Sequence, residues 1–282
     1  MAKNLIRILV TGANGQLAQC IRQFSVDFTY DFLFADRKML DITDAEAVKK
    51  VFSNFEPHLV INTAAYTKVD LAETEIEAAY SINKYGVQNL VEACEQHSTK
   101  FIHISTDYVF SGKASKPYKI THKPAPNTIY GASKLAGERV VLNSKLEAFW
   151  IVRTSWLYSN VGENFYKTIQ KLAQERDLLK VVDDQIGSPT RAEDLAYFLL
   201  RYLPHLNSKT RGIYHFSNSG TASWYDFAKA ILNKYELKTH LTAVTSAEFP
   251  TAAVRPVYSV LDTSKIEENF GFFIRNWKDA LG

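Results

Sequence analysis

Residues 6–18 read Ile-Arg-Ile-Leu-Val-Thr-Gly-Ala-Asn-Gly-Gln-Leu-Ala, and two local patterns meet within them. Ile6 to Val10 form a short β-branched run, which is typical of a buried strand. Gly12 and Gly15 follow at once, and a helix-like segment extends from them to Phe24. A strand that passes through a tight glycine turn into a helix is the first half of a βαβ unit.

The same alternation continues through the first half of the chain. Further strands are predicted at 32–35, 58–62, 101–105 and 149–153, and helices at 44–55, 72–97, 130–142 and 164–176. Strands separated by helices require a parallel sheet with right-handed crossovers. We therefore predict an α/β fold built on a Rossmann-type, doubly wound parallel sheet.

The pattern becomes less regular after Arg153. Strands are predicted at 179–182 and 213–216, helices at 191–203 and 224–235, and an irregular, Pro-containing end. We predict an NAD(P)-binding domain over 1–155 and a smaller, mainly substrate-binding part over 156–282, with segments from about 179–216 returning to the first domain. Because ligands of open α/β sheets bind beyond the carboxyl ends of the strands, the second part is expected to cap that edge.

The composition is that of an ordinary globular protein. Of 282 residues, 46% are hydrophobic and 22% are charged, which excludes disordered, collagen-like and coiled-coil classes. The net charge of +3 is too small at this length to predict a nucleic-acid or membrane partner. No apolar run approaches the ~18 residues of a membrane span, and the run before Gly12 is too short and too charged for a signal peptide.

The two cysteines, Cys20 and Cys94, both fall in predicted helices. No metal-ligand spacing relates them, so neither a disulfide framework nor a zinc site is predicted. A reducing compartment fits this usage, and we expect a cytoplasmic protein without a metal site.

The glycine turn is a candidate phosphate-binding site. The spacing from Gly12 is G-x-x-G-x-x-A, with the small residue Ala18 in the third position, and the turn opens a helix whose N–H groups favour a pyrophosphate. The alternative is a strand-to-helix turn without a ligand. Asp36 and Arg37 end the second predicted strand: Asp36 suits the ribose 2′-hydroxyl of NAD, whereas Arg37 suits the 2′-phosphate of NADP or is simply a solvated side chain. The choice between NADH and NADPH therefore stays open.

Tyr130 and Lys134 lie four residues apart at the start of a predicted helix, so both project from one face. Tyrosine has a reference pKa of about 10, and a neighbouring ammonium would bring it toward neutrality as an acid or base. The alternative is an amphipathic helix start with a solvated lysine. Thr106 and Asp107 end the fourth predicted strand, where they suit a reacting carbonyl oxygen and sugar hydroxyls, or only the turn that follows the strand.

Six stretches of the sequence together match the motifs of a known family: GANGQL at 12–17, NTAAYTKVD at 62–70, STDYVF at 105–110, YGASKLAGE at 130–138, RTSW at 153–156 and DQIGSPT at 184–190. In order and spacing they resemble the dTDP-4-dehydrorhamnose reductases of the extended short-chain dehydrogenase/reductase superfamily. The glycine turn and the Tyr-x-x-x-Lys pair are typical of the whole superfamily, and the other stretches narrow the resemblance to this branch.

The resemblance implies that NADPH or NADH delivers hydride to C4 of dTDP-4-dehydro-L-rhamnose, giving dTDP-L-rhamnose for cell-surface polysaccharide. It implies that Tyr130 protonates the developing alkoxide, that Lys134 holds the nicotinamide ribose, and that Thr106 completes the hydrogen-bond set. The predicted cofactor-binding residues are Gly12, Asn14, Gly15, Gln16, Leu17, Asp36, Arg37, Asp41, Ile42, Ala64, Ala65, Tyr66, Tyr130 and Lys134. The predicted substrate-binding residues are Thr106, Asp107, Trp156, which would stack on the sugar, and Arg255, which would pair with the pyrophosphate.

Asn83 matches an asparagine that often braces the active site in the superfamily, and a poor helix former tolerated on a polar helix face is an equally available interpretation. Some relatives are thought to dimerise through magnesium held partly by a glutamate in the first helix. Cys20 stands at that place here, although Glu193 is near the other acidic position. We therefore expect a monomer or a metal-independent homodimer. The alternatives are a nucleotide-sugar epimerase or dehydratase on the same fold, and a non-catalytic regulatory subunit like the relative that binds methionine adenosyltransferase.

Overall fold

The protein is described by a computed structural model that covers residues 5–282, and its centre is a six-stranded parallel sheet. The strand order is β2–β1–β3–β4–β5–β10. The chain runs from β1 to the edge strand β2 and then crosses to β3 on the other side of β1, so the order reverses beside β1. This confirms the predicted doubly wound α/β fold and places its switch point at the glycine turn. The strands are β1 (Ile6–Thr11), β2 (Tyr30–Ala35), β3 (Leu59–Asn62), β4 (Lys100–Thr106), β5 (Phe149–Thr154) and β10 (Gly212–His215).

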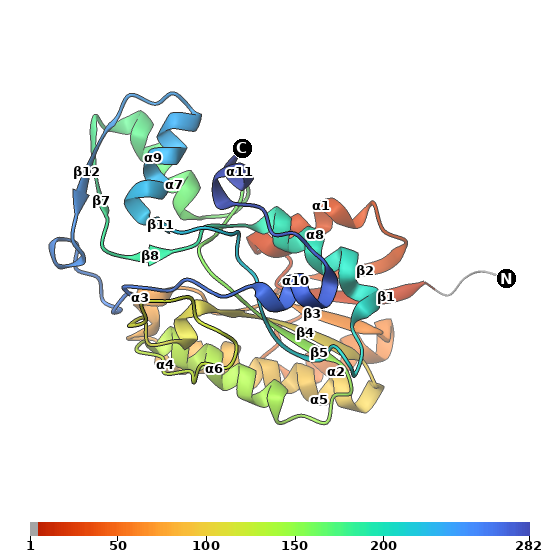
Figure 1. Cartoon of the computed structure of the whole chain (residues 1–282). Helices are drawn as coiled ribbons and strands as arrows, with labels where there is room; N and C mark the ends of the chain where they lie inside the picture. Colours follow the sequence, from red (N-terminus) through yellow and green to blue (C-terminus); the bar gives the residue numbers. More distant parts are fainter. Residues whose placement is uncertain (1–4) are drawn as a thin grey trace.

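Helices cover both faces of this sheet (Figure 1). Successive strand residues point to opposite faces, so Ile8 packs with one set of helices and Leu9 with the other. The first set is α1 (Gln16–Ser25), α8 (Ala192–Tyr202) and α10 (Ser264–Phe270). The second set is α2 (Ala45–Phe55), α5 (Val87–His97) and α6 (Ile129–Leu142). Burial on both faces explains why the strands are continuous apolar runs rather than alternating ones.

A second, smaller core lies beside the carboxyl edge of the sheet, at the upper left of Figure 1. There β7 (Leu178–Val182) pairs in parallel with β12 (His240–Val244), and the packed helices are α7 (Phe165–Glu175), α9 (Trp224–Lys234) and α11 (Trp277–Leu281). Two short pairs join this part to the rest: β6 (Leu157–Tyr158) with β9 (Thr190–Arg191), and β8 (Ile186–Gly187) with β11 (Ala222–Ser223). Of the segments expected to return to the first domain, α8 and β10 join the central sheet and its layers, whereas β7 does not.

The long helix predicted over 72–97 is interrupted in the structure. The short helix α3 (Val69–Ala72) ends where the predicted helix begins, and α4 (Ile76–Tyr80), the π-helix η1 (Ser81–Gly86) and then α5 follow it. The wider turns of η1 carry the fully buried Asn83, whose side chain bonds a neighbouring loop. A π-helical turn inserted into an α-helix is frequent at functional sites and gives no apolar periodicity of its own.

The end of the chain is more regular than predicted. Besides β12, α10 and α11, it contains the 3₁₀ turn η4 (Ser246–Glu248), and two other 3₁₀ turns, η2 (Asp107–Val109) and η3 (Leu203–His205), occur earlier. These short elements are fixed by long-range contacts, such as the parallel pairing of β12 with β7, which a local pattern does not show.

Within residues 5–282, no helix combines the length and the apolar character that crossing a membrane requires.

Candidate active site

A cavity of about 980 Å³ opens at the carboxyl ends of the central strands. Gly12, Thr63, Thr106 and Thr154 enter it from the ends of β1, β3, β4 and β5, respectively. The residues after 155 that line it include Trp156, Phe165, Trp224 and Arg255. Most predicted site residues meet here: Gly12, Asn14, Gly15, Gln16, Leu17, Arg37, Asp41, Ile42, Ala64, Ala65, Thr106, Asp107, Tyr130, Lys134, Trp156 and Arg255.

The glycine turn fits a dinucleotide pyrophosphate. Gly12 has φ +67°, and a Cβ there would lie 2.8 Å from the backbone of Ala64, so only glycine suits this position. Helix α1 starts after Gly15 with no side-chain cap and no acidic residue in its first turn. Its first N–H groups and its positive dipole end are therefore available to an anion at the cavity.

The side chain of Gln16 is used inside the protein. Its Nε2 donates to the carbonyl of Leu157 at 3.0 Å, and its Oε1 accepts from Ser159 Oγ and Asn164 Nδ2, both at 3.2 Å. Gln16 therefore ties the glycine turn to the segment after β5, while the cofactor contact predicted for it stays a prediction.

Asp36 and Arg37 lie differently with respect to the cavity. The carboxylate of Asp36 accepts from the backbone N–H groups of Lys38 and Met39, each at 3.0 Å, and Asp36 does not line the cavity. Arg37 lines it with a largely exposed side chain whose Nε lies 3.1 Å from the Asp41 carboxylate. The geometry thus favours Arg37 over Asp36 as the residue free to reach a cofactor.

Asn83 connects the loop after β3 to helix α6. Its Oδ1 accepts from Tyr66 N at 2.9 Å, and its Nδ2 donates to Tyr66 O at 3.1 Å and to Ser133 Oγ at 2.9 Å. The Tyr66 hydroxyl donates to Glu75 at 2.7 Å, and Tyr66 is not among the cavity-lining residues. Asn83 therefore braces the loop that carries Ala64 and Ala65, whereas the cofactor contact of Tyr66 stays a prediction.

Tyr130 stands in the first turn of α6, whose N-cap Thr128 accepts from Gly131 N at 3.0 Å. Its ring packs edge to face against Tyr108, with the centroids 5.5 Å apart. Burial raises the pKa of the Tyr130 hydroxyl well above its usual range, and the hydrogen bond with Thr106 offsets part of that rise. The phenol is therefore protonated at neutral pH, which is the form that a proton donor needs.

Lys134 lies one helical turn further on and is buried. Its Nζ donates to the carbonyl of Ile104 at 2.7 Å. Burial lowers the pKa of Lys134 to about 8, while the negative charge of Glu138 acts in the opposite direction. Burial is the largest influence on the pKa of Tyr130 here, and the Lys134 ammonium bonds the carbonyl of Ile104, so the predicted lowering of the tyrosine pKa by Lys134 stays a prediction.

Glu138 forms a buried ion pair beneath these residues. No functional role was predicted for it from the sequence. Arg153 Nε and Nη2 donate to its two carboxylate oxygens at 2.8 and 2.6 Å, and Ser105 Oγ donates to it at 2.6 Å. The side chains of Glu138 and Arg153 are 0% and 1% exposed. Helix α6 is thus fixed to β4 and β5 at the level of the catalytic candidates.

Thr106 and Asp107 form a polar pair at the end of β4. Thr106 Oγ1 donates to Asp107 Oδ1 at 3.0 Å and accepts from Tyr108 N at 3.2 Å. Asp107 Oδ2 is buried and has no hydrogen-bond partner among residues 5–282. Burial raises the pKa of Asp107 to about 6. The Ser259 hydroxyl acts on this carboxylate in the direction opposite to burial, so the substrate contact of Asp107 stays a prediction.

Arg255 is already paired. Its Nη1 donates to the Tyr108 hydroxyl at 3.1 Å, and its Nη2 forms an ion pair with Asp70. The structure brings Arg255 to the cavity, but a contact with pyrophosphate would have to share or replace these bonds, so that role stays a prediction.

Comparisons with known proteins agree with this geometry. The family model of the RmlD substrate binding domain matches residues 6–282. A dTDP-4-dehydrorhamnose reductase of Aggregatibacter actinomycetemcomitans is 42% identical over 98% of this chain and 97% of its own length. The chain belongs to the dTDP-4-dehydrorhamnose reductase family. The predicted family and enzyme class are thereby confirmed.

Other relatives of this reductase family extend the comparison. The spore coat polysaccharide biosynthesis protein SpsK of Bacillus subtilis is 40% identical, over 98% of this chain and 96% of its own. The crystal structure of a dTDP-4-dehydrorhamnose reductase from Bacillus anthracis in complex with NADP has a TM-score of 0.94 and 42% identity, covering 98% of this chain and 97% of that chain. A nicotinamide dinucleotide is accordingly the cofactor type of the family, as predicted.

The cavity is also lined by residues that were not predicted from the sequence to belong to the site. Phe165 and Trp224 come from α7 and α9, and Gly162 precedes α7. Trp224 stacks on Trp156, with centroids 3.5 Å apart and planes 6° apart. Apolar residues at helix starts predict only a core position, so no local signal could have placed these side chains here. The long-range pairing of β8 with β11 brings Trp224, which follows β11, to the cavity.

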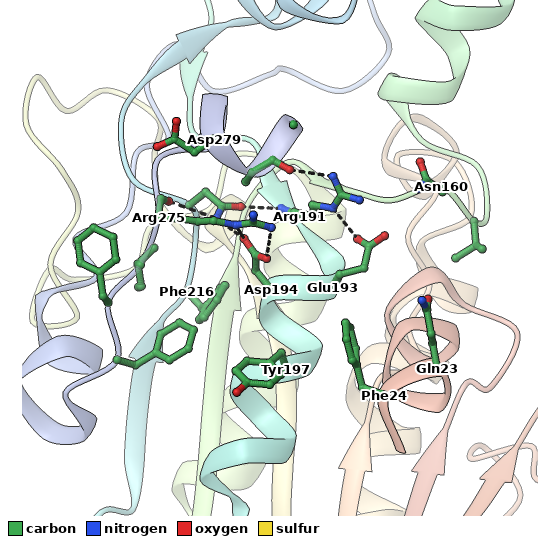
Figure 2. A pocket seen from close by; sticks show the side chains of 17 residues that line it. Gln23, Phe24, Asn160, Arg191, Glu193, Asp194, Tyr197, Phe216, Arg275 and Asp279 are labelled. Carbon is green, nitrogen blue, oxygen red and sulfur yellow. Dashed lines mark hydrogen bonds and ion pairs between the residues drawn. The ribbon is translucent and has the colours of Figure 1, made fainter. Parts of the chain in front are cut away.

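A second cavity, of about 700 Å³, lies at the start of α8 beside α1 (Figure 2). Glu193 and Asp194 line it, and each carboxylate faces an arginine. Arg191 Nε lies 3.4 Å from Glu193, and Arg275 binds Asp194 through two nitrogens at 2.8 and 2.6 Å. Cys20 is buried nearby in α1, and burial together with the charge of Glu193 raises the pKa of its thiol to about 12. Over residues 5–282, no three His, Cys, Asp or Glu side chains gather in a way that could hold a metal ion.

Proposed function

We propose that this chain reduces the C4 keto group of dTDP-4-dehydro-L-rhamnose to give dTDP-L-rhamnose, with NADPH or NADH as the reductant. Family membership supports this reaction. The observation that carries it is the meeting of Tyr130, Lys134 and Thr106 in one cavity with an uncapped glycine turn. The cavity of about 980 Å³ is lined by the glycine turn, by Tyr130 and by residues after 155, which supports binding of both ligands in one place.

The reaction adds one hydride and one proton to a carbonyl group. When bound, the reduced nicotinamide supplies the hydride. Tyr130 supplies the proton to the C4 oxygen, because burial keeps its hydroxyl protonated at neutral pH. Thr106, whose hydroxyl donates to Asp107 and acts on the pKa of Tyr130, is the second hydroxyl that suits the same oxygen. The alkoxide then becomes the C4 hydroxyl of the product, and the proton lost by Tyr130 is regained from solvent.

Lys134 and the glycine turn hold the reductant. Lys134 lines the cavity, and its ammonium, which donates one hydrogen bond to the carbonyl of Ile104, keeps further N–H groups that suit a ribose hydroxyl. Gly12 and Gly15 let the pyrophosphate approach the start of α1. These residues position the dinucleotide and keep it beside the proton donor.

The test is a turnover assay with purified protein, enzymatically prepared dTDP-4-dehydro-L-rhamnose, and NADPH or NADH. Loss of the reduced-nicotinamide absorbance together with formation of dTDP-L-rhamnose is the expected result. Turnover without net consumption of reductant, together with release of tightly held NAD⁺ on denaturation, would instead indicate an epimerase or dehydratase. Absence of any turnover by folded protein that binds NADPH would indicate a non-catalytic subunit.

A further inference from the structure

The short helix α3 carries two acidic side chains that reach two different parts of the candidate active site. Asp70 and Glu73 are three residues apart, so they are neighbours on the surface of one helical turn. The helix lies beside α6, and Thr67 and Val69 at its start line the cavity (Figure 1). Contacts made from this turn can therefore fix separate walls of the cavity relative to one another.

Glu73 holds the start of the helix that carries Tyr130. Its Oε1 accepts from the backbone N–H of Ile129 at 2.9 Å, and Ile129 is the first residue of α6. The first four N–H groups of a helix have no partner within the helix, and the side chain of Thr128 accepts that of Gly131. Glu73 is thus a second cap of α6, bound to the residue directly before the candidate proton donor.

Asp70 holds a loop from the C-terminal part of the chain. Its Oδ1 accepts from the backbone N–H of Ala253 at 3.1 Å, and its Oδ2 forms an ion pair with Nη2 of Arg255. Ala253 is buried, and Arg255 lines the cavity. The guanidinium also donates, through Nη1, to the Tyr108 hydroxyl at 3.1 Å. One carboxylate therefore fixes both the backbone and the charged side chain of this loop.

We propose that Asp70 and Glu73 are positioning residues for the reduction. Glu73 places the proton donor Tyr130 by fixing the start of α6, and Asp70 places the wall that receives the nucleotide sugar by fixing Arg255. The inference rests on the proposed function. Because both carboxylates belong to one turn of α3, this turn sets the position of the donor relative to the bound sugar. A misplacement of about 1 Å at a reacting centre can cost about 10²-fold in rate.

Glu73 is tested by the single-turnover rate of NADPH oxidation, which product release does not limit. Glu73→Ala leaves the Ile129 N–H without its acceptor, so we expect this rate to fall about 10-fold. The Kd for the product dTDP-L-rhamnose, measured by calorimetry on the NADP⁺-loaded protein, should stay within about twofold of the wild-type value. Glu73→Gln keeps a side-chain oxygen as acceptor and should restore the rate to within about threefold of the wild type.

Asp70 is tested by an isosteric substitution. Asp70→Asn removes the charge that pairs with Arg255, so the Kd for dTDP-L-rhamnose should rise about 3- to 5-fold, the effect of a half-exposed ion pair. The KM for the keto sugar should rise with it. The single-turnover rate at saturating sugar and the Kd for NADPH should each stay within about twofold. Two substitutions one turn apart are thus expected to separate, with Glu73 affecting the rate and Asp70 affecting binding of the sugar.

Glu77→Ala is the matched control. Glu77 is an exposed acidic residue in the first turn of the next helix, α4, and it does not line the cavity. Its removal should change neither the rate nor the affinity for the sugar.

The inference fails if Glu73→Ala and Asp70→Asn each change the rate and the sugar affinity together, because the two residues would then only stabilise α3. It also fails if either variant keeps the wild-type values, or if Glu73→Gln is as slow as Glu73→Ala. Failure of the proposed function is distinct, since the wild-type protein would then not oxidise NADPH in the presence of dTDP-4-dehydro-L-rhamnose.

Discussion

The surroundings of Tyr130 favour its neutral form. Desolvation raises the pKa of the phenol, and the charge of Asp107 acts in the same direction. Tyr130→Phe removes the proton but keeps the ring, including its packing on Tyr108. We expect kcat to fall about 10²- to 10⁴-fold, the usual size of general acid catalysis. The Kd for NADPH, measured by fluorescence titration, should not change, and near-normal turnover would show that another group is the acid.

Asp107 is predicted to bind the substrate, and its buried carboxylate lowers the stability of the folded protein. Its pKa in the folded state is about 6, whereas that of an unfolded Asp is about 4, so the folded state binds the proton more tightly. The charged carboxylate therefore lowers the free energy of unfolding of the wild-type protein above pH 6. This destabilisation decreases as the pH falls from 6 toward 4.

Asp107→Asn should remove that destabilisation. We expect it to raise the free energy of unfolding at pH 7.5 by about 1 to 3 kcal/mol, with a smaller gain at pH 5. It should also weaken binding of the nucleotide sugar. Thermal unfolding at the two pH values checks the stability effect, and a gain that grows on acidification would contradict the assignment.

Arg37 is the residue whose position favours contact with a 2′-phosphate. Its side chain is 77% exposed and, among residues 5–282, is paired only with the Asp41 carboxylate. Arg37→Ala should raise the Kd for NADPH about 10-fold or more, because charged hydrogen bonds to a phosphate are lost, and should leave that for NADH unchanged. Asp36→Ala is the matched variant, which should weaken NADH selectively. Equal effects on both dinucleotides would show that neither residue binds at the 2′ position.

Among the elements, α6 carries the tyrosine and is anchored through the Glu138–Arg153 pair. Because that pair is fully buried, Glu138→Ala leaves an uncompensated guanidinium and should cost about 3 to 5 kcal/mol in urea unfolding. Glu138→Met combined with Arg153→Met removes both charges and should recover much of that loss. Glu46→Ala, in an exposed pair with Lys49, is the control and should change little. Equal losses in the single and double variants would contradict the buried-charge argument.

The elements that could be predicted from sequence are those defined by local pattern. The strand at 6–11 and the helix at 16–25 follow from a β-branched run and a glycine turn, and α6 follows from its helical periodicity. The π-helix at 81–86 could not be predicted, since the bonds of Asn83 to Tyr66 and Ser133 that hold it are distant in sequence. The pairing of β12 with β7 could not be predicted from the sequence for the same reason.

At the scale of the whole molecule, the candidate active site lies where the carboxyl edge of the central sheet meets the second core, and both parts contribute residues to it. The turn at Gly12 and the pair Tyr130 and Lys134 could be placed from sequence, because motif spacing and a parallel sheet bring them to one edge. The orientation of Trp156 could not, because it depends on Trp224 and on the space left by Gly187. Motifs therefore identify which residues meet, whereas the packing of the second core determines how they present themselves.

The geometry at the start of α8 bears on how whole molecules associate. A magnesium bridge at the start of α8 needs several oxygen ligands free to coordinate the ion. Asp194 is bound by Arg275 through two nitrogens, Glu193 faces Arg191, and burial keeps the Cys20 thiol neutral with a pKa of about 12. A neutral thiol is a poor ligand for a hard cation, and freeing Asp194 for a metal would remove the ion-pair partner of Arg275. We therefore predict that any self-association is independent of divalent metal and that turnover is unaffected by a chelator. Light scattering and the reductase assay, each with and without EDTA, check this prediction, and a dimer that dissociates in EDTA and re-forms with magnesium would contradict it.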